Sequence, residues 1–182
     1  MTRRAPLLLA LAAASLSLVG CGLTPLYAGG QGGRIANTLR SISVDPIEGE
    51  TGWIVRDALR QRLAAAGTSV RDSGARYRLA VRLDDRISGL GVRLDDTVSR
   101  ERRTLRARWQ LIDAASGETL LDATSGTDAG IDVVGSEYAT IAAERTALER
   151  LAEALAGQMV ARVAAYAATG ATAGEPTPAP SR

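Results

Sequence analysis

The chain of 182 residues contains no histidine and a single cysteine, Cys21. Without histidine it cannot form a Ser-His-Asp triad, a Cys-His pair or a metal site with imidazole ligands. A lone cysteine cannot close an internal disulfide, so the fold must be stabilised by packing. These absences argue against an enzyme, and they give no reason to expect a metal or another cofactor.

Phenylalanine and lysine are also missing, and the chain has only two Trp and four Tyr. The core must therefore consist mainly of Leu, Ile, Val and Ala. Every basic residue is Arg, and the distribution of charge is uneven. Residues 71–108 hold 11 Arg against 6 acids, whereas residues 113–162 hold 9 acids against 3 Arg. Arginine suits bidentate contact with phosphate, although genomic base composition alone can produce such a bias.

The N-terminus has the pattern of a secretory signal peptide. Arg3 and Arg4 precede an apolar run from Leu7 to Val19, which is shorter than the roughly 20 residues that a membrane-spanning helix needs. The next residues complete Leu18-Val19-Gly20-Cys21, which resembles the lipobox of bacterial lipoproteins. The resemblance implies that Cys21 receives acyl chains such as palmitate and becomes the first mature residue. Several acyl chains on one residue anchor a protein firmly to a membrane.

Composition divides the remaining chain into a tether, one domain and a tail. The tether is rich in glycine, which favours a flexible linker, and the tail combines prolines with a lack of apolar periodicity. The predicted parts are a signal peptide at 1–20, a tether at 21–33, a single domain at 34–168 and a disordered tail at 169–182. Within the tether, Leu26 and Tyr27 are less typical of a linker, because both would gain by docking on another surface.

Apolar periodicity within the domain predicts four strands and two helices. The expected strands are Asn37–Val44, Tyr77–Leu83, Thr97–Ile112 and Thr119–Thr127, and the expected helices are Thr51–Ala66 and Val134–Tyr166. Gly67 would end the first helix, Gly89 and Gly91 would lie in a turn or bulge, and Ser116-Gly117 would form a turn. This β-α-β-β-β-α order predicts an α+β fold with a four-stranded mixed or antiparallel sheet and both helices on one face.

The pattern also predicts how the helices are oriented. In the first, Val55, Leu59 and Leu63 would face the core, with Ile54 and Ala58 beside them, while Arg56, Asp57 and Arg60 would face water. In the second, the apolar stripe would contain Ile141, Leu148, Leu151, Ala152, Leu155 and Met159. Arg145 and Glu149 would form a pair four residues apart on the outside, and Gly157 could weaken or bend the helix.

Arginine alternates with apolar residues in two of the predicted strands. If the leucine-rich faces meet the helices, Arg78, Arg82, Arg106 and Arg108 project together from the uncovered sheet face. Two interpretations stay open: a solvated face with Arg-acid pairs across strands, or a surface that binds anions through guanidinium groups. Nucleic acid fits the charge but not the export signal. An anionic lipid or glycolipid fits both.

Two acidic pairs and one glycine motif are further candidate sites. Asp84-Asp85 and Asp95-Asp96 could form an acid pair or a cation site, but turn and strand-end acids explain them better. Gly89-Leu90-Gly91 lacks the rest of a phosphate-binding loop.

Taken together, the lipobox, the segment Cys21-Gly22-Leu23-Thr24-Pro25-Leu26-Tyr27 and the order of elements resemble the LPS-assembly lipoprotein LptE family. The opening is similar to alphaproteobacterial members that begin with Cys-Gly-aromatic-x-Pro-Leu-Tyr, although Leu23 stands where an aromatic residue is commoner. The resemblance covers roughly residues 18–166.

The resemblance implies a non-enzymatic lipoprotein of the outer membrane, anchored on the periplasmic side. Such proteins plug the β-barrel LptD, help it assemble and bind lipopolysaccharide, which basic residues contact. Strand alternation makes Arg78, Arg82, Arg106 and Arg108 the candidates here. The alternative function is an auxiliary lipoprotein of an ABC-type lipid transport system. A lipoprotein enzyme would need catalytic groups that this chain lacks.

Overall fold

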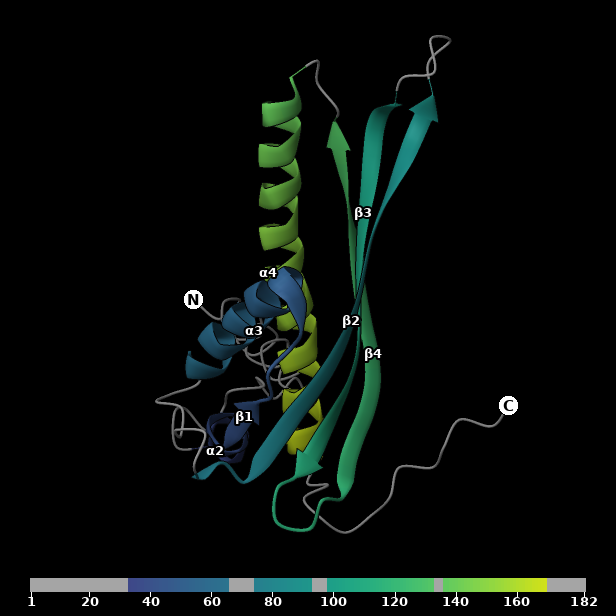
Figure 1. Ribbon diagram of the computed structural model, residues 1–182. Coiled ribbons are helices and arrows are strands. Elements are labelled where there is room, and N and C mark those ends of the chain that lie inside the picture. The colour runs from purple at the N-terminus through teal and green to yellow at the C-terminus, as the bar shows by residue number, and fades with distance from the viewer. Residues whose placement is uncertain (1–32, 66–73, 93–97, 133–135, 170–182) are drawn as a thin grey trace, which may run out of the picture.

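The computed structural model describes residues 33–65, 74–92, 98–132 and 136–169. They form one four-stranded sheet with helices packed against a single face (Figure 1). The elements in chain order are α2 (Arg34–Arg40), β1 (Ile42–Val44), α3 (Gly49–Ala64), β2 (Tyr77–Val92), β3 (Val98–Asp113), β4 (Thr119–Asp132) and α4 (Glu137–Ala168). The predicted α+β class is confirmed, with one short helix more than expected among the described residues.

The sheet is mixed, and its strand order follows the chain: β1-β2-β3-β4. Strand β1 pairs in parallel with Tyr77–Leu79 at the start of β2, whereas β2, β3 and β4 pair antiparallel along their length. Strands β2 and β3 have 16 residues each, which corresponds to about 50 Å at roughly 3.3 Å per residue. The molecule is therefore a long, narrow two-layer structure.

The hydrophobic core lies between the sheet and the helices. Leu105, Ala107, Trp109 and Leu111 alternate along β3 and are all buried, as the period of two requires. The indole nitrogen of Trp109 donates a hydrogen bond to the Ser125 hydroxyl at 3.1 Å. The expected core positions Val55, Leu59 and Leu63 of α3 are buried, with Ile54 and Ala58 partly buried beside them. Helix α4 packs on β3 and β4, and α3 packs beside it.

The prediction of a strand over Asn37–Val44 is wrong in its first half. Residues Arg34–Arg40 form α2, and only Ile42–Val44 forms β1. The helix ends where the Ser41 amide donates to the carbonyls of Asn37 and Thr38. A helix of seven residues shows only about two turns of period, so its apolar residues could be taken for strand alternation.

The prediction of a turn or bulge at Gly89 and Gly91 is also wrong, because β2 continues through both to Val92 and its register with β3 does not shift there. Strand β4 likewise extends five residues beyond the predicted end at Thr127, to Asp132. Both glycine-containing segments pair with β3, which lies alongside them. The predicted turn at Ser116-Gly117 is confirmed: Gly117 has a φ of 74°, and the amides of Ala115 and Ser116 donate to the Asp113 carboxylate.

Helices α3 and α4 form close to the predicted bounds. Two predicted details of their orientation are wrong, and one is confirmed. Arg56 is partly buried rather than facing water, and it donates to the Val44 carbonyl at 3.1 and 3.2 Å. Ile141 is 57% exposed, because the first turns of α4 extend past α3 (Figure 1). The pair of Arg145 and Glu149 is present at 3.5 Å.

Helix α4 continues through Gly157. The predicted signal peptide, Cys21, the tether up to residue 32, the stop at Gly67, the tail beyond Thr169 and the pair Asp95-Asp96 lie outside the described residues. None of the helices in the described part of the chain is both long enough and apolar enough to cross a bilayer.

Candidate functional site

All four predicted arginines project from the sheet face opposite the helices. Even-numbered residues of β2 and β3 share this face because side chains alternate along a strand, and Arg78, Arg82, Arg106 and Arg108 are exposed. The register places Arg82 directly opposite Arg108 and Asp84 opposite Arg106. Arg82, Arg106 and Arg108 therefore lie together, while Arg78 lies farther along, opposite Ile112.

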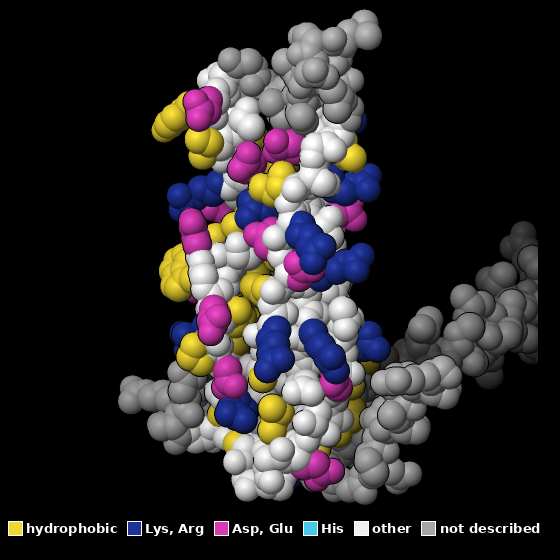
Figure 2. Space-filling model, turned by 45° about the vertical axis from the view of Figure 1, so that its right-hand side comes forward, with side chains coloured by type: hydrophobic (Ala, Val, Ile, Leu, Met, Phe, Trp, Pro, Cys, Tyr) yellow, Lys and Arg dark blue, Asp and Glu magenta, His cyan; other side chains and the backbone are white. Residues whose placement is uncertain are grey.

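Three more arginines lie on the same face and were missed from the sequence. Arg86, Arg100 and Arg102 have the same parity in the same two strands and are exposed. Alternation could have identified Arg100 and Arg102, since both fall within the predicted strand Thr97–Ile112. We call the seven residues Arg78, Arg82, Arg86, Arg100, Arg102, Arg106 and Arg108 the arginine face. Figure 2 shows arginine side chains along this side, with acidic side chains between them.

Five of these arginines have acidic partners, as the solvated-face interpretation predicts. The ion pairs are Arg78–Asp45 at 3.7 Å, Arg86–Asp84 at 2.9 Å, Arg100–Asp132 at 2.9 Å, Arg102–Asp128 at 3.8 Å and Arg108–Asp122 at 3.2 Å. Most of the side chains involved are largely exposed to water, and exposed pairs contribute only about 0–1 kcal/mol each. These pairs therefore neutralise charge on the arginine face but contribute little to the free energy of unfolding.

Arg82 and Arg106 are different, because neither makes an ion pair or a side-chain hydrogen bond within the described residues. Arg82 also faces Arg108 across the strands, and like charges in opposite positions repel. Seven arginines on this face meet five aspartates, which leaves a net charge of 7 − 5 = +2. The unpaired charge is concentrated at the middle of the face.

A shallow depression of about 320 Å³ lies beside Arg106, between β3 and β4. Its lining includes Thr104, Thr124, Arg106 and Gly126, and also the acidic Asp128, which pairs with Arg102 at 3.8 Å. Gly126 lies opposite Arg106, and a Cβ at Gly126 would lie 3.2 Å from the Arg106 Cγ. The missing side chain leaves room for Arg106 across β4. Guanidinium and hydroxyl donors around one hollow are suitable for an anion such as phosphate.

Asp122 shows which donors are already engaged. It accepts hydrogen bonds from Gln110 at 2.8 Å and from Arg108 at 3.2 Å. Both bonds lower the pKa of the Asp122 carboxyl, and the bond from Gln110 has the larger effect. Asp122 therefore stays ionised and holds Arg108, whereas Arg82 and Arg106 keep free donors for a ligand.

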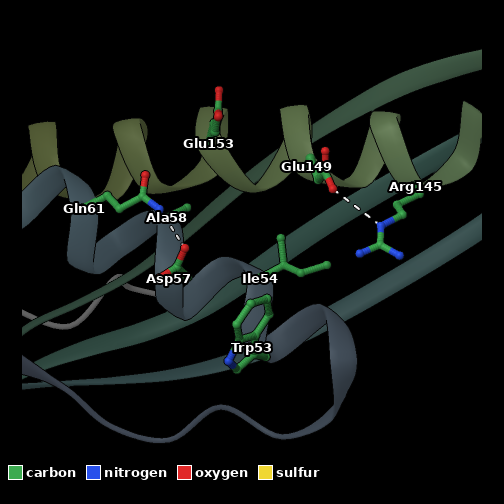
Figure 3. A pocket seen from close by; sticks show the side chains of 8 residues that line it. All are labelled: Trp53, Ile54, Asp57, Ala58, Gln61, Arg145, Glu149 and Glu153. Atoms are coloured by element: carbon green, nitrogen blue, oxygen red, sulfur yellow. Dashed lines mark hydrogen bonds and ion pairs between the residues drawn. The ribbon is translucent and has the colours of Figure 1, made fainter. Parts of the chain in front are cut away.

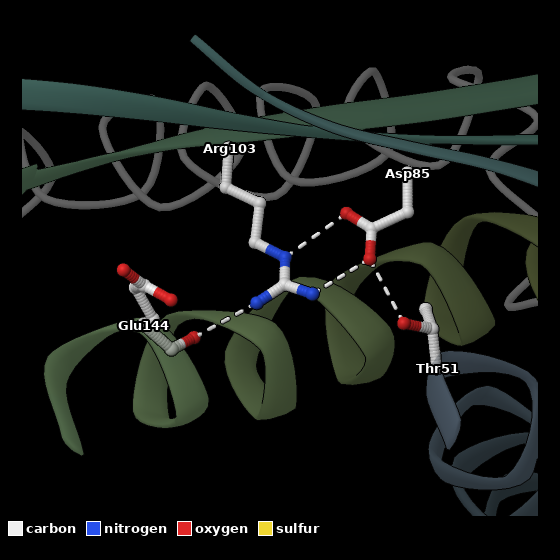
Figure 4. Close-up of polar contacts among 4 residues, drawn as sticks. All are labelled: Thr51, Asp85, Arg103 and Glu144. Carbon is white, nitrogen blue, oxygen red and sulfur yellow. Dashed lines mark hydrogen bonds and ion pairs between the residues drawn. The ribbon is translucent and has the colours of Figure 1, made fainter. Parts of the chain in front are cut away.

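A second polar cluster lies on the helix side of the sheet (Figure 4). Arg103 on β3 donates to both carboxylate oxygens of Asp85 on β2, at 2.9 and 2.6 Å, and to the Glu144 carbonyl on α4 at 3.3 Å. Thr51 on α3 donates to Asp85 at 2.8 Å. The Arg103 bond is the main reason that the pKa of Asp85 is lowered. This cluster joins four elements and is structural.

The position of Asp84 and Asp85 in β2 also shows whether they could form an acid pair. Asp84 and Asp85 lie in the middle of β2, not in a loop, and they point to opposite faces. They cannot act on one substrate together. No group of three or more Asp, Glu or Cys side chains within the described ranges could hold a metal ion.

Comparison with known proteins identifies relatives in sequence and in fold. The profile of the LptE family, described as lipopolysaccharide-assembly, matches residues 39–163. No curated protein sequence matches the chain.

Among solved structures, a protein of Caulobacter crescentus CB15 described as a lipoprotein is similar, with 26% identity and a TM-score of 0.64, over 80% of this chain and 100% of that one. A minor lipoprotein of Acinetobacter baumannii has 17% identity and a TM-score of 0.56, over 68% of this chain and 90% of that one. Lipoprotein B of Nitrosomonas europaea has 14% identity and a TM-score of 0.55, over 71% and 83%. At these lower identities the last two show the fold alone.

Proposed function

Because the chain belongs to the LptE family of lipopolysaccharide-assembly proteins, we propose that it plugs the outer-membrane β-barrel LptD, helps that barrel assemble and binds lipopolysaccharide through its arginine face. A general role in lipopolysaccharide assembly as an envelope lipoprotein follows from the family match and the Caulobacter relative. The barrel partner, the outer-membrane location, the anchor at Cys21 and the binding site are the proposal. Catalysis has no part in it.

The observation that carries the proposal is the uncovered arginine face with its unpaired centre. Arg106 lines a hollow of about 320 Å³, and Arg82 lies on the neighbouring strand β2, opposite Arg108. Phosphate groups on lipid A would accept paired hydrogen bonds from such guanidinium groups. Bound phosphates would also relieve the repulsion between Arg82 and Arg108, which lie opposite each other.

The shape of the molecule supports a position inside a barrel. Strands β2 and β3 extend for about 50 Å, and a single layer of helices covers one side of the sheet (Figure 1). Such a narrow body can occupy the lumen of a wide barrel. The sheet face would then remain accessible to glycolipid, while other surfaces contact the barrel wall.

Co-purification of the detergent-extracted, full-length protein tests the barrel partner. A stoichiometric outer-membrane β-barrel is the expected result. A stoichiometric inner-membrane ABC complex would instead support the alternative function, an auxiliary lipoprotein of a lipid transporter. Recovery of the protein without either partner would contradict both assignments.

A further inference from the structure

Helices α3 and α4 enclose a groove that is separate from the arginine face. It has a volume of about 200 Å³ and is lined by Trp53, Ile54 and Asp57 of α3 and by Arg145, Glu149 and Glu153 of α4. Figure 3 shows Trp53 and Ile54 near one end of this helix groove, with the strands behind both helices. The groove therefore opens on the helix side of the molecule, not on the sheet side.

Trp53 is the most unusual residue of the helix groove. Its side chain is 69% exposed, although burial of a large aromatic ring would be strongly favourable. Ile141, which is 57% exposed, lies one turn before Arg145 on α4, so it extends the same side of the helix. Trp is enriched among the residues that dominate binding energy, so an exposed Trp that lines a groove is a candidate contact residue.

The charge of the helix groove is opposite to that of the arginine face. The lining of the groove contains three acids, Asp57, Glu149 and Glu153, and one base, Arg145. Its net charge is therefore 1 − 3 = −2. Arg145 lies 3.5 Å from Glu149, and Asp57 accepts a hydrogen bond from the neutral Gln61 at 2.6 Å. Within the described part of the chain Glu153 has no ion-pair partner. An anionic lipid would be repelled here, whereas a cationic group would be attracted.

We propose that the helix groove docks a segment of a protein partner that carries an apolar anchor side chain flanked by Lys or Arg. The anchor packs against Trp53 and Ile54, and the flanking cations pair with Asp57 and Glu153. An arginine of the segment can also stack on the Trp53 ring. This assignment goes beyond the proposed function, because it gives the helices a protein partner whether or not the arginine face binds lipopolysaccharide.

Site-specific photo-crosslinking in the full-length, membrane-bound protein tests the docking site. Trp53 is replaced by p-benzoylphenylalanine, an aromatic group suited to an exposed position, and the crosslinked peptide is sequenced by mass spectrometry. The same probe at Ala161, an exposed position on α4 outside the helix groove, is the control. The expected product from position 53 is a partner segment with an apolar residue between basic ones, and no such product from position 161.

A charge variant makes the test specific. Combining Asp57→Asn with Glu153→Gln keeps the shape of both side chains but removes two negative charges, and the crosslink yield should fall about tenfold, which corresponds to about 1.4 kcal/mol. Glu118→Gln, an exposed acid outside the helix groove, should leave the yield unchanged. Circular dichroism of both variants shows that the fold is retained.

Several results would overturn the proposal. They are a crosslink to a segment without basic residues, a crosslink to lipid, a crosslink within this chain or to a second copy of it, no protein crosslink at all, or an unchanged yield in the Asp57→Asn/Glu153→Gln variant. Failure of the barrel to co-purify would not affect this result, because the crosslinked segment is identified by its own sequence.

Discussion

Two helical glycines differ in what surrounds them, and this difference predicts opposite effects of alanine. A Cβ at Gly52 would lie 2.6 Å from the Ile47 carbonyl oxygen, a backbone atom that cannot move freely. A Cβ at Gly157 would meet the flexible end of Arg62 at 3.2 Å, which can shift. Gly52→Ala should therefore destabilise the protein by about 1–3 kcal/mol, whereas Gly157→Ala should stabilise it by up to about 1 kcal/mol through helix propensity. Thermal unfolding of both variants is the measurement, and shifts of the same sign would contradict the argument.

The bond between Arg103 and Asp85 predicts a pH dependence. The pKa of Asp85 is lowered from 3.8 in the folded state, mainly by the Arg103 hydrogen bond, so the folded protein favours the ionised carboxylate. The stability that this provides is fully present above pH 3.8 and is lost as the pH falls through the lowered pKa. Asp85→Asn should cost about 1–3 kcal/mol at neutral pH, and the difference from the unmodified protein should narrow in acid.

Urea unfolding at neutral pH and below pH 3.8 measures this effect. Asp84→Asn is the matched control, because Asp84 is the exposed neighbour on the opposite face and pairs with Arg86 in solvent. Its substitution should change stability by less than about 0.5 kcal/mol. Equal losses for the two variants would show that the Arg103–Asp85 bond has no special role.

At the level of the strands, the pairing pattern separates free arginines from engaged ones. The variant Arg82→Gln/Arg106→Gln removes the two without ionic partners, so it should weaken lipopolysaccharide binding more than any other pair on the arginine face. A charged hydrogen bond contributes about 1.5–3 kcal/mol where it is shielded and less where salt screens it. Titration with lipopolysaccharide at low and physiological salt measures the change.

The matched control for this experiment is Arg86→Gln/Arg100→Gln. It removes two arginines from the same face that already pair with Asp84 and Asp132, and its effect on binding should be smaller. Both variants should keep their circular-dichroism spectra, since all four side chains are exposed. Unaltered affinity in the folded Arg82/Arg106 variant would exclude an anion site at the centre of the face, while the family assignment would remain.

The same strands show why some elements were predictable and others were not. Alternation over the long β3 identified both its buried face and its arginine side, because a period of two is a property of the extended backbone. The short helix α2 has too few residues to display a helical period. Gly89 and Gly91 have low intrinsic strand preference, and they belong to β2 only because β3 lies alongside and pairs with Gly89, Leu90 and Val92.

For the whole molecule, the N-terminal anchor remains a prediction that determines where the protein is located. Cys21→Ala removes the thiol that lipidation requires, so the precursor should stay uncleaved or reach the wrong membrane. Metabolic labelling with a radioactive fatty acid, followed by membrane fractionation, measures both effects. Label that persists on the Cys21→Ala protein would end the lipoprotein assignment for this residue.

The amino-acid sequence was sufficient to predict the α+β class and the faces to which Val55, Leu59, Trp109 and the four arginines belong, whereas the export signal stays a prediction. These features follow from local patterns, because composition and the strand and helix periods act within a few residues. The pairing of Arg108 with Asp122, the freedom of Arg82 and Arg106 and the groove beside Trp53 depend instead on strand register and helix packing. Such contacts join residues far apart in the chain, and only folding brings them together.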